Sequence, residues 1–399
     1  FGSKVNEINI EKGRISIECP LELLYEIAEH PIVQCIEFIA PPIVADGILD
    51  ESERIISTYI SDNPGKGFYF DGSGVKIGVE EGGIVDPIQD PNFRSRIDRS
   101  NETSTNISGH KTGVAMRMGS AGNVNPKDRG TAFGAEVHSG GFDFANAALN
   151  QVTIINRSVG WGCPSGSETY NSSSQNYDNL VRTYPSFMIT HSAGNIGGSN
   201  CYAGAAGWGN ITGLPKMAKN IFVVGSSGND GTLAGFSSRG PAKDGRILPN
   251  IVAPGAGGTS HASPNLAGVY GQLNQAYRFH NGGVIPNSGL LKAVILNTAD
   301  DMLNPGPDFK TGFGHVNARR AYEVIRQGQH NVSAIAQGAS NTHTIAVPQN
   351  LKELKVLVYW VDWEATPGIV SRAIVNDLDI VLQDPNAISY QPWVLNPNF

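Results

Sequence analysis

Residues 250–278, NIVAPGAGGTSHASPNLAGVYGQLNQAYR, place a serine between very small residues and an apolar stretch of helical spacing. Gly257 and Gly258 precede Ser260, and Ala262 follows it. A helix that begins beside Ser260 would direct unpaired main-chain N–H groups and the positive end of its dipole toward the hydroxyl, and such groups stabilise an oxyanion. A serine that only caps a helix does not need glycine and alanine on both sides. We therefore expect Ser260 to be a nucleophile that a substrate approaches closely.

A nucleophilic serine needs a general base, an acid that orients the base, and a donor for the oxyanion. The candidate base is His110 in SGHKTGVAM, where a glycine precedes it and a helix is expected to begin. The candidate donor is Asn195 in SAGNIGG, an amide beside glycines at the end of an expected strand. The acid should end the first strand of a sheet, where GVKIGVEEGG offers Glu80 and Glu81.

The elements that would position these residues are short apolar runs between residues 47 and 330. They are GVKIGV, QVTIINRS, SFMITHSAGN and NIFVVGSSG, and they alternate with helical stretches and Gly-rich loops. Such runs are typical of strands in a parallel sheet that is covered on both faces. Chemistry in such sheets gathers at the carboxyl ends of the strands. We expect an α/β domain here, with a doubly wound, mainly parallel sheet sandwiched by helices.

Two further regions flank this domain. Residues 1–46 follow a strand, helix and strand pattern in RISIEC, PLELLYEIAEH and IVQCIEFIA. Residues 331–399 contain short strands separated by turn residues, which is a β-sandwich pattern with too few strands to close the sandwich. The sequence therefore predicts three domains, 1–46, 47–330 and 331–399.

Composition narrows the class of protein. Charged residues make up 16% of the chain, and the net charge of −7 comes without a basic stripe, so we expect no nucleic-acid partner. No window approaches 18 continuous apolar residues, so we expect no membrane span. The N-terminus lacks the basic and then apolar start of a signal peptide, and we expect that any targeting segment was lost before Phe1. A high content of Gly, at 48 residues, favours a loop-rich extracellular protein.

The 4 cysteines form no CxxC pair, which argues against a zinc site. Cys163 and Cys201 lie in the Gly-, Ser- and Asn-rich segments GWGCPSGS and GGSNCYAG. We expect a disulfide that ties these two loops together, with free thiols as the alternative. Cys19 and Cys35 lie on the two strands expected in residues 1–46, where a second bridge is an open alternative.

Several motifs together resemble the subtilisin-like serine proteases, the subtilases. They are NIVAPG followed by GTSHASPNLAG, GHKT before GVA, SAGN, INRSVG and FSSRGP, and the similarity covers most of residues 70–325. The chain is similar to secreted bacterial subtilases that carry a C-terminal jelly-roll domain. This resemblance implies a secreted or cell-surface serine endopeptidase with polypeptide substrates. An esterase of the α/β-hydrolase kind does not fit, because G-x-S-x-G is missing and the serine follows the histidine.

The resemblance implies a role for each site residue. Ser260 would be the nucleophile, His110 the general base and Asn195 the oxyanion donor. Glu80 stands at the position of the family's aspartate and would orient the histidine, while Glu81 would point to the other face. The residues along the substrate backbone and the first specificity pocket would be Ser158, Gly160, Ala193 and Gly194.

Two further expectations come with the resemblance. Residues 1–46 would correspond to the last part of a propeptide that assists folding and blocks the cleft, which makes this segment a partner of the site. Structural calcium is also implied, with oxygen ligands clustered at Asn376, Asp377 and Asp379, although a solvated strand end is the alternative. No cofactor is expected for the chemistry itself.

The chain also departs from the family pattern. Glu80 is one methylene longer than aspartate, and Lys111 and Met116 replace glycines of the family's histidine segment. Only Ala256 and Gly257 separate APG from GTS, where the family has a longer loop. Displacing a catalytic group by about 1 Å can cost roughly 100-fold in rate. Two hypotheses follow: a serine endopeptidase whose activity is reduced or lost, and an inactive binding or assembly module with the same fold.

Overall fold

The computed structural model describes residues 4–9, 14–18, 23, 26–27, 30, 69–160, 162–163, 168–201, 205–213, 215–369 and 371–398. The chain divides into two compact units, residues 1–46 and 47–399.

In the first unit, β1 (Lys4–Asn9) pairs with β2 (Arg14–Glu18) in an antiparallel hairpin. Strand β2 coincides with the run RISIEC, whereas β1 was not predicted. The second predicted strand lies outside the described residues, as do Cys19, Cys35 and most of the predicted helix.

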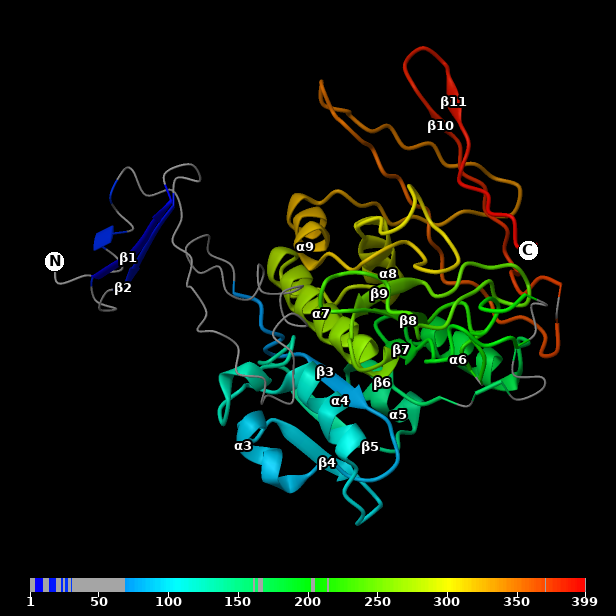
Figure 1. Cartoon of the computed structure of the whole chain (residues 1–399). Coiled ribbons are helices and arrows are strands. Elements are labelled where there is room, and N and C mark those ends of the chain that lie inside the picture. The colour runs from blue at the N-terminus through cyan, green and yellow to red at the C-terminus, as the bar shows by residue number, and fades with distance from the viewer. Residues whose placement is uncertain are drawn as a thin grey trace. The chain divides into compact units, whose positions relative to one another are not determined.

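A seven-stranded parallel sheet forms the centre of the second unit (Figure 1). In spatial order its strands are β4 (Ile97–Asn101), β5 (Glu136–Gly140), β3 (Lys76–Val79), β6 (Val152–Arg157), β7 (Met188–Ser192), β8 (Phe222–Ser227) and β9 (Ile251–Pro254). Every residue of β7, β8 and β9 is buried, as expected for strands covered on both faces. The predicted doubly wound, mainly parallel α/β fold is confirmed.

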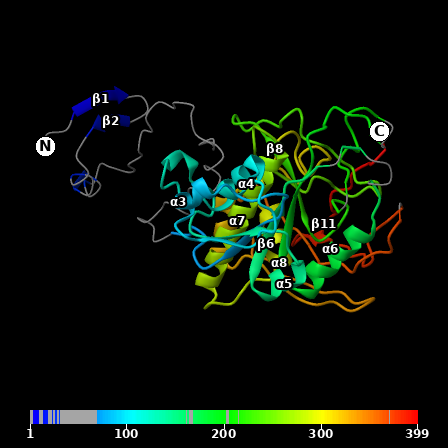
Figure 2. The same ribbon diagram turned by 90° about the horizontal axis from the view of Figure 1, so that it is seen from below.

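Helices cover both faces of this sheet. They are α3 (Asp90–Phe93), α4 (Gly109–Gly119), α5 (Phe144–Leu149), α6 (Ser172–Thr183), α7 (Thr259–His280), α8 (Ser288–Asn297) and α9 (Ala318–Gln327), with the 3-10 turns η3 (Pro87–Gln89) and η4 (Pro126–Asp128). Helices α4 and α7 pack against each other and against the sheet, whereas α5 and α6 lie on the opposite face (Figures 1 and 2). None of the helices in the described part of the chain is long and apolar enough to cross a membrane.

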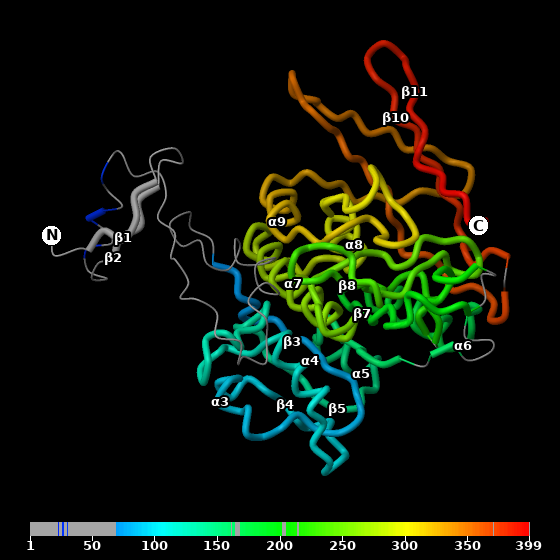
Figure 3. Tube along the Cα trace, in the orientation of Figure 1, coloured from blue at the N-terminus to red at the C-terminus, as the bar shows by residue number. Residues whose placement is uncertain are grey.

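The described residues after α9, for which an incomplete β-sandwich was predicted, run mainly as extended chain (Figure 3). The regular elements in this C-terminal segment are β10 (Leu382–Gln383) and β11 (Ser389–Tyr390), each two residues long. A sandwich buries the apolar inner faces of two sheets. Here Ile345 and Val347 stay 48% and 54% exposed, so no second sheet covers them.

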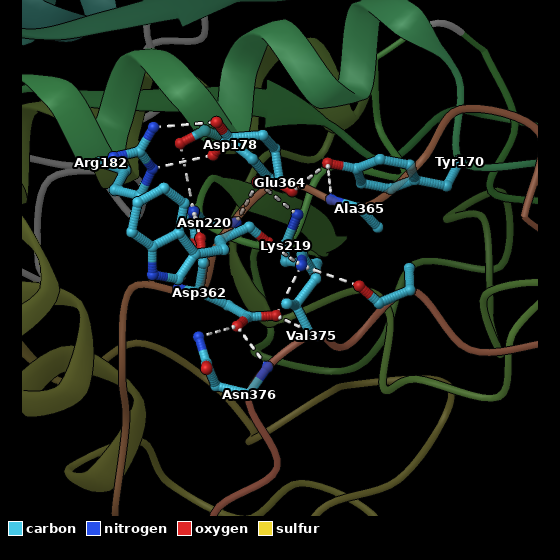
Figure 4. A network of polar contacts seen from close by, with 12 residues as sticks. Tyr170, Asp178, Arg182, Lys219, Asn220, Asp362, Glu364, Ala365, Val375 and Asn376 are labelled. Carbon is cyan, nitrogen blue, oxygen red and sulfur yellow. Dashed lines mark hydrogen bonds and ion pairs between the residues drawn. The ribbon is translucent and has the colours of Figure 1, made fainter. Parts of the chain in front are cut away.

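A buried polar network instead fixes part of the C-terminal segment to the α/β domain (Figure 4). Lys219 Nζ lies 2.5 Å from Asp362 Oδ2, and both side chains are almost fully buried. The other carboxylate oxygen of Asp362 accepts the main-chain and side-chain N–H groups of Asn376. Arg182 donates two hydrogen bonds of 2.8 Å to Glu364. The predicted boundary between the second and third domains therefore does not separate two compact units.

Candidate active site

Ser260 is the second residue of α7, which begins at Thr259. Gly258 precedes the helix with φ of 153°, a conformation that favours glycine. A Cβ atom on Gly258 would lie 3.2 Å from Asn195 Nδ2 and 3.5 Å from Ser260 Oγ. The glycine therefore leaves open the space that these two side chains share. A reacting group needs that space.

The start of α7 is also tied to the sheet. Pro264 lies in the second turn and has no N–H, so the carbonyl oxygen of Ser260, four residues earlier, lacks its helical partner. Ser158 Oγ donates a hydrogen bond of 3.1 Å to that oxygen. Asn156, at the end of β6, donates to Ser158 Oγ and accepts a 2.6 Å hydrogen bond from Ser263 Oγ. This chain of side chains fixes the helix turn that carries the serine; Asn156 and Ser263 were not anticipated from the sequence.

Asn195 follows β7 and is oriented by the residue before the serine. Its Oδ1 accepts hydrogen bonds from the N–H and the hydroxyl of Thr259, both at 2.8 Å. These bonds direct Nδ2 toward the space beside Ser260. A donor held in place before the reaction is the arrangement that stabilises an oxyanion best. The structure thus brings Asn195 and Ser260 together, with Thr259 as a support that the sequence reasoning missed.

His110 lies in the first turn of α4, where Ser108 caps the helix by accepting the N–H of Lys111. His110 Nδ1 lies 2.6 Å from Glu81 Oε2. The Glu81 carboxylate is 5% exposed, whereas the imidazole is about half exposed. The hydrogen bond to Glu81 raises the pKa of His110, and the charge of Glu81 adds to this, against the opposing effects of burial and Arg117.

Glu80, predicted to be the partner of His110, is turned to Arg157 instead. Strand β3 ends one residue before Glu80, so the alternation of faces within a strand does not reach the second glutamate. Burial raises the pKa of Glu80, although Arg157 and Lys111 oppose this. The prediction that Glu80 and not Glu81 faces the histidine is wrong; Glu81 does.

Lys111, which departs from the family pattern, supports this arrangement. Its side chain is fully buried, and Nζ donates hydrogen bonds to the main-chain oxygens of Gly83 at 2.9 Å and Glu81 at 3.2 Å. The carboxylate of Glu102 lies 4.0 Å away. Burial lowers the pKa of Lys111. The lysine thus ties α4 to the loop that carries Glu81.

The helices that carry His110 and Ser260 pack against each other. The pKa of His261, the residue after the serine, is also affected by the site. Burial lowers this pKa to about 4, and the charges of Arg117 and His110 add to the effect. Within the part of the chain that the structure describes, no hydrogen bond joins Ser260 Oγ to His110. Contact between these two groups therefore stays a prediction.

A cavity of about 200 Å³ lies beside Ser260. Its walls include the four residues predicted to flank a substrate, namely Ser158, Gly160, Ala193 and Gly194. Asn195 also lines the cavity, as does Lys216, which the sequence reasoning missed. Lys216 stands in the apolar segment before β8, and a lysine surrounded by apolar residues was the signal that could have identified it.

The predicted disulfide between Cys163 and Cys201 is present, with Cα atoms 5.7 Å apart. Cys163 belongs to the loop after β6 and Cys201 to the loop after β7. Both loops contribute residues to the walls of the cavity.

Among the described residues, one group of three side chains has the spacing of a metal site, Asp98, Glu136 and His138 on β4 and β5. The two carboxylates contact opposite sides of the imidazole. Asp98 lies 3.3 Å from Nδ1, and Glu136 lies 2.7 Å from Nε2. Because one ion cannot bind both ring nitrogens, the group is better described as a histidine between two carboxylates.

Two of the three residues predicted to hold calcium contact other side chains. Asn376 Nδ2 donates to Asp362 at 3.0 Å, and Asp377 pairs with Arg372 at 2.5 Å. Structural calcium stays a prediction.

A sequence model of the subtilase family matches residues 47–314, and the chain belongs to this family. Pyrolysin of Pyrococcus furiosus is 32% identical over 117 residues, which are 24% of this chain and 8% of pyrolysin. The subtilisin-like protease SBT6.1 of Arabidopsis thaliana is 24% identical over 303 residues, 70% of this chain and 28% of that protein. The chain thus spans well under a third of the length of either relative.

Solved structures show the same fold. The CspB protease of Clostridium perfringens superposes with a TM-score of 0.56 at 15% identity, covering 69% of this chain and 99% of that chain. A lanthipeptide protease superposes with a TM-score of 0.51 at 17% identity, covering 69% and 95% of the two chains.

Proposed function

We propose that this subtilase is a serine endopeptidase that cleaves peptide bonds with Ser260. The observation that carries the proposal is the 2.6 Å contact between Glu81 and Nδ1 of His110, because it leaves Nε2 as the nitrogen that can accept a proton. The shared open space between Asn195 Nδ2 and Ser260 Oγ supports the same reaction. Membership of the subtilase family is consistent with it.

In the proposed reaction, His110 Nε2 takes the hydroxyl proton as Ser260 Oγ bonds to the carbonyl carbon of the peptide. The carbonyl oxygen becomes an oxyanion and accepts a hydrogen bond from Asn195 Nδ2. Glu81 keeps the imidazole in one tautomer and stabilises the imidazolium. The C–N bond then breaks as Nε2 passes its proton to the leaving amine. This leaves the acyl group of the peptide as an ester on Ser260. Water, activated by His110 in the same way, then attacks the ester, which releases the carboxylic acid and restores the serine hydroxyl.

An inactive binding or assembly module with the same fold is the alternative that the departures from the family pattern raised. The contacts of Lys111 favour the peptidase. This lysine bonds to the loop of Glu81 and so supports an acid that reaches the histidine. A fold without catalysis has no need for that support.

Labelling with a fluorophosphonate tests the proposal, because the probe reacts only with an activated serine hydroxyl. We expect the wild-type protein to be labelled and Ser260→Ala to stay unlabelled. Ser73→Ala is the matched control, since Ser73 is an exposed serine, and it should be labelled like the wild type. A folded wild-type protein that takes no label would favour the binding module.

We also propose that the protein works outside the cytoplasm, as the resemblance to secreted bacterial subtilases implies. The disulfide between Cys163 and Cys201 supports this, because disulfides persist in oxidising compartments. A propeptide-like role for residues 1–46 is a further proposal, and it rests on the resemblance alone.

A further inference from the structure

Lys216 is the one charged residue among the described residues that line the cavity beside Ser260. Its side chain is 1% exposed. Nζ donates a 3.2 Å hydrogen bond to the main-chain oxygen of Ala193, the one hydrogen bond that the described part of the chain gives it. An ammonium group has three protons to donate. Two therefore remain for a ligand.

The charge of Lys216 has no counter-ion among the described residues. Burial lowers the pKa of this amine to about 8, so it keeps its proton near neutral pH. The neighbouring His191 is neutral there, because burial and then the charge of Lys216 hold its pKa well below the ordinary value. A buried ammonium without a counter-ion is costly for a fold. Such groups cluster where a ligand supplies the missing partner.

Gly194 leaves space beside the ammonium at the wall of the cavity. Its φ is 121°, and a Cβ atom there would lie 3.7 Å from Lys216 Nζ and 2.8 Å from Ser238 Oγ. Another polar wall residue, Asn210, already donates from its side-chain amide to the main-chain oxygens of Gly197 and Ser199, both at 3.1 Å. The two unused protons of Lys216 are therefore the charged donors that this pocket offers to a ligand, in addition to the amide of Asn195.

We propose that Lys216 makes this cavity a pocket for an acidic side chain, a glutamate or aspartate at the residue whose carbonyl Ser260 attacks. This inference rests on the proposed function, since it takes Ser260 as the nucleophile. A volume of about 200 Å³ suits one side chain and lies below the roughly 300–1,000 Å³ of pockets for small-molecule ligands. A carboxylate would accept the two free protons in charge-assisted hydrogen bonds. A basic side chain would meet a like charge, and a neutral one would leave the ammonium unpaired.

A series of chromogenic tetrapeptides tests the inference. The peptides share three residues and differ only at the residue before the cleaved bond, which is glutamate, glutamine, leucine or lysine. Glutamine has nearly the shape of glutamate without the charge, so this pair isolates the ion pair. We expect kcat/KM for the glutamate peptide to exceed that for the glutamine peptide by about tenfold or more, with the lysine peptide lowest.

Lys216→Met removes the charge at similar volume and should bring the glutamate-to-glutamine ratio to about one or below. Lys243→Met is the matched control, because Lys243 is an exposed lysine, and it should leave the ratio unchanged. If Lys216→Met does not fold, the wild-type ratio alone decides. A wild-type enzyme that cleaves the glutamine or leucine peptide as well as the glutamate peptide overturns the inference and leaves the peptidase intact.

Failure of the proposed function would look different. In that case no peptide is cleaved and the fluorophosphonate does not label Ser260. The affinity of Ser260→Ala protein for the glutamate and glutamine peptides then still tests the pocket, by calorimetry. Tighter binding of the glutamate peptide supports the pocket, and equal dissociation constants overturn it.

Discussion

The two glutamates after β3 differ in what they contribute to the site. Glu81 reaches Nδ1 of His110, whereas Glu80 is turned to Arg157. A carboxylate that holds an imidazole in place also stabilises the imidazolium that forms during attack. The two neighbours should therefore differ sharply in their effect on rate.

We expect Glu81→Gln to lower kcat by about 10³–10⁴-fold, because an amide carries no charge and can hold the wrong tautomer. Glu80→Gln makes the same chemical change one residue away and should cost far less. Steady-state kinetics on one peptide substrate, with both variants checked for folding by circular dichroism, provide the comparison. Equal losses in the two variants would show that Glu81 has no special role.

The raised pKa of His110 predicts the pH dependence of activity. The base works only when neutral, so kcat/KM should rise with pH through an inflection above the ordinary histidine value of about 6.5. Glu81→Gln removes the main cause of the shift, so the inflection should move to lower pH while the plateau falls. A pH–rate profile of both proteins measures this. An inflection that stays at the same pH in Glu81→Gln would show that the contact with Glu81 does not raise the pKa of His110.

The raised pKa of His110 affects activity and stability in opposite directions as the pH rises. The folded protein favours protonated His110, so the pairing of His110 with Glu81 stabilises the fold. This contribution is fully present at pH values below the pKa that His110 has in the unfolded chain. This contribution is lost as pH rises through the folded pKa. Activity therefore increases over the range in which the stabilising effect of this ion pair disappears.

At the scale of elements, α4 both carries the histidine and supports its acid. Lys111, one residue after His110, bonds to the main-chain oxygens of Glu81 and Gly83. We expect Lys111→Met to lower kcat by about 10–100-fold, because a small displacement of the acid is enough, while KM changes little. Kinetic measurement of kcat and KM separately distinguishes this positioning role from a general loss of folded protein.

Lys292 on α8 provides the matched control for that experiment. It is also a fully buried lysine, and it bonds to the main-chain oxygens of Lys219 and Ile221. Lys292→Met should lower stability and leave kcat of the folded fraction unchanged. If both variants lose kcat equally, Lys111 acts through stability alone.

The parallel strands of the α/β domain, and the location of Ser260, His110 and Asn195 at helix starts and a strand end, could be predicted from the sequence, because such ends leave local patterns. The apolar neighbours of Lys216 in the sequence were a signal of burial, but a lysine is by default a solvated surface residue. The packing of distant segments is what shows that Lys216 lines the cavity beside Ser260. The choice between Glu80 and Glu81 failed for a related reason, since it depends on how the chain turns after a strand has ended.

At the scale of the whole α/β unit, the carboxylate of Asp362 anchors part of the C-terminal segment. Asp362 pairs with Lys219 from 143 residues away and accepts N–H groups from its own segment (Figure 4). We expect Asp362→Ala to lower the free energy of unfolding by about 3–5 kcal/mol, because it leaves the buried ammonium of Lys219 without its counter-ion. Urea denaturation of the full chain measures this loss.

Asp377→Ala is the control, because Asp377 and its partner Arg372 are both more than half exposed. That change should cost less than about 1 kcal/mol. Similar losses in the two variants would mean that the network does not anchor the segment.

The C-terminal segment also shows why a local pattern does not establish a β-sandwich. Alternating runs such as HTIAVPQ specify strands locally, but a sandwich also needs a second sheet to cover them. The pair Lys219 and Asp362, which links this segment to the α/β domain, joins two different predicted domains. Nothing in the local pattern of either residue indicates that they meet.

The bridge between Cys163 and Cys201 joins the two loops that form walls of the cavity beside Ser260. The disulfide therefore fixes the distance between the two loops, and with it the width of the pocket, before a peptide binds. Reduction removes this restraint and leaves the catalytic groups unchanged, so we expect the reduced enzyme to keep its kcat. It should discriminate less between side chains and have a higher KM for its best peptide. Comparing the tetrapeptide series with and without a reductant checks this; an unchanged profile would contradict it. The selectivity of this protein would then depend on the redox state of the compartment in which it folds.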